Sequence, residues 1–189
     1  MDAPLFYGEY MKIRLANLDD VPAIKIIMDR AIAELQASFL TKEQLAASTA
    51  AMGLDMQLIH DGTYFCVVDD GQIVGCGGWS RRATLYGGSH SGKRDDKLLN
   101  PKYDRARIRA MYTHPEHVRR GIGGMIIAKA EQAARDEGFR AIEMAATMAG
   151  KPLYLSCGYH IESEWMDTQG AVPVPLATMV KNLSDNLPE

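Results

Sequence analysis

The sequence predicts a mixed fold of the α/β (α+β) class, in which a largely antiparallel sheet is flanked by helices. Three observations indicate it: a strand-like stretch runs directly into an amphipathic helix near the N-terminus, two β-rich runs flank an Asp-Gly pair, and a strand–helix–strand unit fills much of the second half. The chain has 189 residues, of which 47% are hydrophobic and 24% charged. These proportions suit one globular domain spanning residues 1–189.

The first elements follow from periodicity and capping. Residues 11–16 alternate apolar and polar side chains as a half-buried strand does. Apolar residues then recur at helical spacing over 21–35, which predicts a helix that faces the core. Thr41 and Gln44 stand three apart in a capping-box pattern. We therefore expect a second helix from there to about residue 59.

The middle of the chain predicts a hairpin and an insertion. Residues 64–68 and 72–79 are rich in strand-forming side chains, and Asp69-Asp70-Gly71 between them favours a tight turn. A polar insertion follows at about residues 80–104. Loops of this length are usually functional or disordered, so it is either a lid on the substrate side or an unstructured insertion.

The second half predicts a β–α–β unit followed by a shorter helix and two more strands. Pro173 and Pro175 indicate that the last of these strands lies at a sheet edge or contains a bulge, because proline cannot donate to a ladder. The expected elements are a strand over 106–113, a helix over 121–137 closed by Gly138, a strand over 139–146, a helix over 151–157, and strands over 159–165 and 174–180.

Composition excludes several function classes. The formal net charge of −3 argues against a nucleic-acid partner, since binding to phosphate backbones needs a surplus of Lys and Arg. The three cysteines lack CxxC spacing, so neither a disulfide framework nor a zinc cage is indicated. Residues 1–10 lack the features of a signal peptide, and no apolar run approaches the ~20 residues that span a bilayer. We expect a cytoplasmic protein with no membrane partner.

The segment between the predicted strand at 106–113 and the helix that follows carries the chemistry. Gly121, Gly123 and Gly124 stand where that helix begins, and glycines there let unpaired backbone N–H groups close on an anion. Arg119 and Arg120 add cationic donors at the same place. A phosphate-binding turn is the interpretation that these five residues favour.

Two familiar phosphate loops do not fit this segment. A dinucleotide fingerprint needs a third glycine where the chain has Ile126, and the Gly-Lys-Ser/Thr of a P-loop is absent. The segment instead resembles the signature of the GCN5-related N-acetyltransferase (GNAT) superfamily, Gln/Arg-x-x-Gly-x-Gly/Ala. Gly121 and Gly123 match its glycines, while Val118 stands at its first position.

A second stretch strengthens the resemblance. Tyr154, Gly158 and Tyr159 are similar to the family's Tyr-x-x-x-Gly-Phe/Tyr, although Thr147 stands where members often have asparagine. The resemblance implies a GNAT-like fold whose parallel fourth and fifth strands splay to admit acetyl-CoA. It also implies an N-acetyltransferase that uses acetyl-CoA as co-substrate and transfers the acetyl group to a primary amine of a small molecule or peptide by direct attack.

The resemblance and the turn together give the candidate site residues. Tyr154 is the candidate catalytic acid, because its hydroxyl can protonate the departing thiolate. The candidate coenzyme A contacts are Met111, Tyr112, Thr113, Arg119, Arg120, Gly121, Ile122, Gly123, Gly124 and Thr147. Asp104, His114 and Glu116 are alternatives for the general base, and the sequence does not decide among them.

Several alternatives stay open from the sequence. Strand alternation puts Arg107 and Arg109 on one face with Met111 and Thr113, so the two arginines either pair with acids or bind a substrate carboxylate. The spacing of His114 and His117 supplies no third ligand, and no metal is expected. A homodimer is compatible with the sequence, and a non-catalytic acyl-CoA sensor is the alternative to an enzyme.

Overall fold

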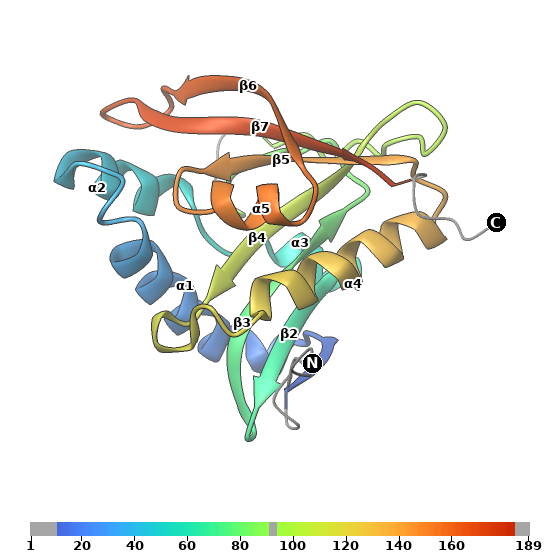
Figure 1. Cartoon of the computed structure of the whole chain (residues 1–189), viewed down its shortest axis with the longest axis horizontal. Coiled ribbons are helices and arrows are strands. Elements are labelled where there is room, and N and C mark those ends of the chain that lie inside the picture. Colours follow the sequence, from blue (N-terminus) through green and yellow to red (C-terminus); the bar gives the residue numbers. More distant parts are fainter. Residues whose placement is uncertain (1–10, 91–93, 184–189) are drawn as a thin grey trace, which may run out of the picture.

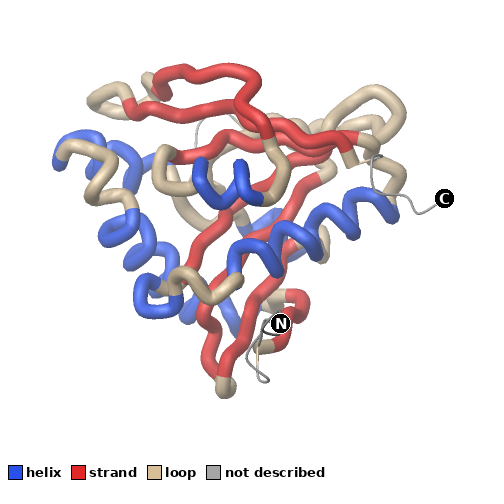
Figure 2. The backbone as a smooth tube through the Cα atoms, viewed as in Figure 1, coloured by secondary structure: helices blue, strands red, loops and turns tan. Residues whose placement is uncertain are grey.

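The computed structural model describes residues 11–90 and 94–183, so residues 1–10, where no signal peptide was expected, and Lys93 of the insertion lie outside it. It has a seven-stranded sheet in the order β1-β2-β3-β4-β5-β7-β6, with helices on both faces (Figures 1 and 2). The strands are β1 (Lys12–Leu15), β2 (Tyr64–Asp69), β3 (Gln72–Ser80), β4 (Ala106–Thr113), β5 (Ala141–Thr147), β6 (His160–Asp167) and β7 (Val174–Asn182). The helices are α1 (Val21–Leu35), α2 (Lys42–Ala51), α3 (Met56–His60), α4 (Ile122–Asp136) and α5 (Lys151–Ser156), with short 3-10 turns at Leu18–Asp20 and Pro115–His117.

The sheet is antiparallel except between β4 and β5, which confirms the predicted fold class. These two strands pair only where Ala106 faces Ile142 and Arg107 faces Glu143. Beyond that point they diverge, and α5 lies over the wedge between them (Figure 1). The opening therefore lies at the carboxyl ends of β4 and β5, where the sequence places the candidate site.

Alternation along β2 explains why both faces of the sheet are covered. Tyr64 and Cys66 pack with the apolar residues of α1 and α3, whereas Phe65 and Val67 pack on the α4 side. Each of these four side chains is at most 3% exposed. Burying a large apolar side chain contributes roughly 1.5–3 kcal/mol, so the two helical layers hold the central strands rigidly.

The predicted hairpin between β2 and β3 is confirmed. Asp70 and Gly71 both have positive φ, 46° and 78°, as a two-residue turn of the primed type requires. Asp69 pairs with Gln72 on either side of the turn. Local turn chemistry therefore fixes this part of the sheet.

The helix expected from Thr41 to about residue 59 is wrong in its second half. The capping box is present, with the Gln44 N–H donating to Thr41 Oγ1 at 3.2 Å, but α2 ends at Ala51. Met52 then adopts extended backbone, and the side chain of Asp55 caps the separate helix α3. The new cap interrupts the periodic pattern, and the break brings Met52 to the cavity described below.

The expectation that 174–180 forms an edge strand is also wrong. Strand β7 lies between β5 and β6, and the bulge in this part of the sheet is in β6, between Ile161 and Ser163. The ladder with β5 extends only to Leu176, so Pro175 lies where β7 pairs with β6 alone. A proline is tolerated there because no neighbour on the β5 side requires its missing N–H.

A bulge in β4 overturns the predicted faces of that strand. Ala110 has a φ of 51°, and Ala110 and Met111 together lie opposite Gly77 of β3. The alternation changes phase at this point. Ile108 and Met111 therefore pack on the α4 side, while Tyr112 packs on the α1 side. Arg107 and Arg109 thus do not share the face of Met111 and Thr113.

The polar insertion between β3 and β4 is ordered in its described part. Its two limbs pair, with the Ala83 N–H donating to Lys97 O at 3.0 Å and the Thr84 N–H to Asp95 O at 2.9 Å. Its far end bonds to the α2–α3 break, where the Ser89 N–H donates to Leu54 O at 3.1 Å. Residues 81–99 are called the excursion below. Among the described residues, no helix is both long and apolar enough to cross a membrane.

Candidate active site

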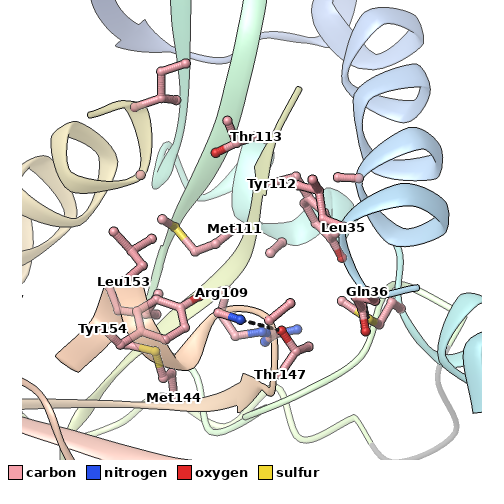
Figure 3. Close-up of a pocket in the computed structure, with 18 of the residues that line it drawn as sticks. Leu35, Gln36, Arg109, Met111, Tyr112, Thr113, Met144, Thr147, Leu153 and Tyr154 are labelled. Carbon is pink, nitrogen blue, oxygen red and sulfur yellow. Dashed lines mark hydrogen bonds between the residues drawn. The ribbon is translucent and has the colours of Figure 1, made fainter. Parts of the chain in front are cut away.

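A cavity of about 670 Å³ occupies the wedge between β4 and β5 and continues toward the end of α1. Figure 3 shows Leu35 and Gln36 on one side of it and Leu153 and Tyr154 on the other. Of the sequence-predicted residues, it is lined by Met111, Tyr112, Thr113, Arg119, Gly121, Ile122, Gly123, Gly124, Thr147, Tyr154 and Arg109. Arg107 and Arg120 are not among its lining residues.

The start of α4 presents free backbone amides to one end of this cavity. Gly121 is the N-cap with a φ of 82°, and no side chain caps the helix there. A Cβ on Gly123 would lie 2.5 Å from the Leu153 side chain, so this glycine lets α5 approach α4 closely. A Cβ on Gly124 would meet nothing within 4 Å. The result is an open helix N-terminus whose dipole and amides suit an anion.

The two arginines before this turn are placed differently. Arg119 lines the cavity with a φ of 64°, and it forms no ion pair with any residue that the structure describes. Arg120 instead forms an ion pair with Asp69 at the end of β2, with 2.8 Å between Nη1 and Oδ2. Only Arg119 is therefore positioned beside the free amides. The left-handed backbone at Arg119 turns the two neighbouring side chains in different directions, which the sequence could not indicate.

The β4 bulge lies at the middle of the cavity. The Tyr64 hydroxyl donates to the Ala110 carbonyl at 2.7 Å, which holds the bulge from the α1 side. Two β4 residues face Gly77 alone. Some backbone N–H and C=O groups near Met111 therefore have no partner in the ladder with β3. Beyond Arg107 no β5 residue pairs with β4 either. Backbone polar groups of β4 are consequently available to a ligand at this point.

Tyr154 lies in the wall of the cavity on α5, with 8% of its surface exposed. Burial raises the pKa of its hydroxyl, and the nearby Cys157 raises it further. The phenol therefore stays protonated at neutral pH and can donate a proton. Thr147 lies close by at the end of β5, where its Oγ1 accepts from the Gly150 N–H at 3.2 Å.

None of the three predicted alternatives for the general base lines the cavity. The Asp104 carboxylate accepts from the Asn100 N–H, Glu116 is 69% exposed and pairs with Arg30, and His114 Nε2 lies 2.9 Å from the Arg30 guanidinium. His117, which has no role in the sequence-based scheme, does line the cavity near the α4 turn.

Arg107 and Arg109 both have acidic partners. Arg107 pairs with Glu143 of β5. Arg109 donates to Asp55 Oδ2 at 3.1 Å, and the side chains of this pair are each 3% exposed. Arg109 also donates to the Thr84 and Gly87 carbonyls, each at 2.7 Å. Both arginines thus form ion pairs, which is one of the two uses considered from the sequence. Arg109 also holds the excursion in place through its hydrogen bonds to these two carbonyls.

The end of the cavity away from α4 uses residues that sequence reasoning missed. Gly53, Leu85, Tyr86 and Gly87 line it together with α1 residues. The Tyr86 hydroxyl is buried without a hydrogen-bond partner among the described residues, and burial raises its pKa. These residues come from the α2–α3 break and the excursion. No motif or periodicity marked them, because they meet only through tertiary packing.

Within residues 11–90 and 94–183, no three His, Cys, Asp or Glu side chains gather as metal ligands would. The rings of His114 and His117 contact each other, with their Nδ1 atoms 3.3 Å apart. This pair orders the loop before the α4 turn.

Comparisons with known proteins agree with this geometry. The profile of the Acetyltransferase (GNAT) family matches residues 29–159. Among solved structures, a GCN5-related N-acetyltransferase from Rhodopseudomonas palustris is similar with a TM-score of 0.67 and 18% identity, covering 92% of this chain and 96% of its own. YncA from Salmonella typhimurium, solved with its cofactor acetyl-CoA, gives a TM-score of 0.62 and 20% identity over 96% of this chain and 99% of its own.

The PaiA N-acetyltransferase of Thermoplasma acidophilum, in complex with coenzyme A, gives a TM-score of 0.59 and 14% identity over 91% of this chain and 98% of its own. A search of curated proteins finds no match. At these identities the structural likeness shows the fold, and the family profile supplies the assignment.

Proposed function

Since the chain belongs to the acetyltransferase (GNAT) family, we propose that it transfers the acetyl group of acetyl-CoA to the primary amine of a small molecule or peptide by direct attack. One observation carries this proposal. A single cavity joins an uncapped helix N-terminus, suited to a pyrophosphate, to a closed end of different chemistry that can hold an acceptor. Both reactants can therefore occupy the wedge at once, as direct transfer requires.

The cofactor end of the cavity consists of Arg119, the amides that open α4, and the wall formed by Thr113, Thr147 and Leu153. The amides of Gly123 and Gly124 and the guanidinium of Arg119 would bind the pyrophosphate through charge-assisted hydrogen bonds. The residues present fit the group, because a Cβ on Gly124 would enter open space rather than protein. Acetyl-CoA bound there would supply the activated thioester for transfer.

The residues at the middle of the cavity have separate tasks. Backbone N–H groups at the β4 bulge, near Met111, would stabilise negative charge that develops on the thioester oxygen. The Tyr154 hydroxyl would donate its proton to the departing thiolate sulfur, since its raised pKa keeps the phenol protonated. Proton donation of this kind typically contributes at least about 10²-fold to the rate.

Removal of the amine proton would fall to water or to the imidazole of His117, which lines the cavity. No Asp or Glu is among the described residues that line the cavity. An alkyl amine with a pKa near 10.4 is neutral in about 1 part in 10³ at pH 7. The rate at low amine concentration should therefore rise with pH as the acceptor itself loses its proton.

The presence of an acceptor end favours an enzyme over a non-catalytic acyl-CoA sensor. A sensor needs only the cofactor end of the cavity. Leu35, Met52 and Tyr86 close a second compartment beyond the β4 bulge, which a sensor would not use. Steady thiol release from acetyl-CoA in the presence of amines tests the difference, and binding without turnover across an acceptor panel would favour the sensor.

A matched pair of variants at Gly124 tests the cofactor end. Gly124→Asp would place a carboxylate beside the pyrophosphate, whereas Gly124→Asn adds nearly the same volume without charge. Neither side chain meets protein at its Cβ, and an acidic residue in the first turn does not weaken a helix. We expect Gly124→Asp to weaken coenzyme A binding about tenfold more than Gly124→Asn, by like-charge repulsion near the surface. Equal binding by both variants would contradict the proposed site.

A further inference from the structure

The acceptor end of the cavity is formed by Ala31, Leu35, Gln36, Met52, Leu85 and Tyr86. Four of these side chains are apolar, and Tyr86 adds an aromatic ring. The Gln36 amide is already engaged, since its Oε1 accepts from the Ser48 hydroxyl at 3.2 Å and its Nε2 contacts the Met52 sulfur at 3.3 Å. The walls therefore offer an acceptor mostly apolar contact, and the Tyr86 hydroxyl is a polar group that has no partner among the described residues.

The charged side chains that line the cavity are all basic in the described ranges 11–90 and 94–183. They are Arg109 and Arg119, the imidazole of His117 also lines the cavity, and no carboxylate is present among the lining residues. Arg119 stands just before the start of α4, and His117 lies in the 3-10 turn that precedes it. Of the two lining arginines, Arg109 is the one that donates to the excursion at the acceptor end.

The buried charges behind the acceptor end carry no surplus of negative charge. Asp55 pairs with Arg109 at 3.1 Å and with Arg94 at 2.9 Å, so one carboxylate serves two guanidinium groups. Asp96 also contacts Arg94, but its side chain is 58% exposed and water screens it. A second buried carboxylate, Asp167, is 4% exposed, and after burial its charge is the next cause that raises the pKa of the Tyr86 hydroxyl. Two buried guanidinium groups and two buried carboxylates therefore leave no net negative charge behind the wall.

We propose that the acceptor is a primary amine with an apolar body and no second positive charge, and that its far end is neutral or carries a carboxylate. This inference rests on the proposed function and names its substrate class. A second ammonium group would enter a compartment with no carboxylate among its described lining residues and no net negative charge behind its wall, where it loses water without gaining a partner. Polyamines and other polycations are thereby excluded as preferred acceptors.

Three acceptors that differ only at the far end test the proposal: hexylamine, 1,6-diaminohexane and 6-aminohexanoate. We expect kcat/KM for the diamine to be at least about tenfold below the values for the other two, from unit charges several ångströms apart in a partly buried site. The wild-type protein suffices for this comparison. A diamine used as well as hexylamine, or better, would overturn the proposal.

If the charge of the acceptor end sets the preference for hexylamine over 1,6-diaminohexane, a variant at Leu35 that adds a carboxylate should reverse this preference. Leu35→Glu places one carboxylate in the acceptor end, and Leu35→Gln has the same shape without the charge. The ratio of kcat/KM for 1,6-diaminohexane over hexylamine should rise about tenfold in Leu35→Glu relative to Leu35→Gln. An equal ratio in the two variants, both folded by thermal melting, would count against the proposal.

Binding of the same amines separates this inference from the proposed function. Calorimetric titration into the coenzyme A complex reports the order of affinities whether or not transfer occurs. Absence of thiol release with every amine would contradict the acetyltransferase proposal. Tighter binding of hexylamine and 6-aminohexanoate than of the diamine would still support the proposed charge preference. Tightest binding of the diamine, or no binding of any of the three, overturns it.

Discussion

The two ends of the cavity are built in different ways. The cofactor end takes Arg119, Gly121, Gly123 and Gly124 from one short turn and uses backbone amides that a helix start leaves free. The acceptor end takes side chains from α1, from the α2–α3 break and from the excursion, which are far apart in sequence. The first is set by local conformation, whereas the second exists only when tertiary contacts hold its pieces together.

This difference predicts that the two ends can be altered separately. Variants at the α4 turn should change coenzyme A binding, and variants that loosen the excursion should change amine recognition. Effects that cross from one end to the other would indicate that the cavity behaves as a single unit.

Arg109→Met should have the largest effect, because Arg109 joins Asp55 to the Thr84 and Gly87 carbonyls. Asp55 keeps its pair with Arg94, so the loss comes mainly from the two carbonyls left without a donor and should be about 1–3 kcal/mol of unfolding free energy. With the excursion loosened, we expect KM for the amine to rise by about tenfold or more while the Kd for coenzyme A stays unchanged. Urea denaturation and steady-state kinetics measure the three quantities.

Arg107→Met is the matched control for this prediction. This substitution also removes an ion pair, the one with Glu143, but Arg107 does not line the cavity. The control should lose stability without raising KM for the amine. The separation of the two ends is wrong if Arg109→Met weakens coenzyme A binding and leaves amine recognition intact.

Tyr154→Phe probes the junction between the two ends. Loss of the proton donor should lower kcat by about 10²-fold with little change in the Kd for coenzyme A. Tyr159→Phe serves as control, since Tyr159 packs against Tyr154 with ring centroids 6.1 Å apart but does not line the cavity. A Tyr154→Phe enzyme as fast as the Tyr159→Phe enzyme would remove Tyr154 from the mechanism.

The pH dependence of the wild-type protein follows from the same group. Burial raises the pKa of Tyr154, so the phenol keeps its proton throughout the neutral range and loses it only above the usual tyrosine value of about 10. We therefore expect kcat at saturating amine to show no fall between about pH 7 and 9. A decline in kcat within that range, absent from Tyr154→Phe, would show that the phenol ionises earlier than its environment indicates.

Arg119→Asn should have a smaller effect, confined to the cofactor end. Asparagine tolerates the left-handed backbone found at this position, so the turn should persist. Loss of one charge-assisted contact should raise the Kd for coenzyme A about tenfold. Arg120→Asn, which removes only the pair with Asp69, should change that Kd little. The opposite ranking of the two variants would place the pyrophosphate beside Arg120.

Local sequence signals predicted the features that local physics decides. The Asp70-Gly71 turn, the Thr41 cap, the start of α4 at Gly121 and the closing Gly138, whose φ is 89°, were all indicated by residue type and spacing. The order in which β5, β7 and β6 pair was not, because strand neighbours are chosen by contacts between distant segments.

The errors in the site have the same origin. The β4 bulge depends on Gly77 of the partner strand and on the Tyr64 hydroxyl, neither of which is visible in the alternation of β4 itself. The break after Ala51 can be predicted only if Asp55 is recognised as the N-cap of a new helix. The bulge shapes the middle of the cavity and the break shapes the acceptor end, which is why the sequence indicated the cofactor end in more detail.

The central claim is that the amides opening α4 bind the pyrophosphate of coenzyme A. Titration of ¹⁵N-labelled protein with coenzyme A, followed by the backbone amide resonances of Gly123 and Gly124, tests it directly. We expect these resonances to shift strongly, while those of the β2–β3 turn at Asp70 and Gly71 stay in place. Saturation with coenzyme A that leaves both glycine resonances unmoved would contradict it.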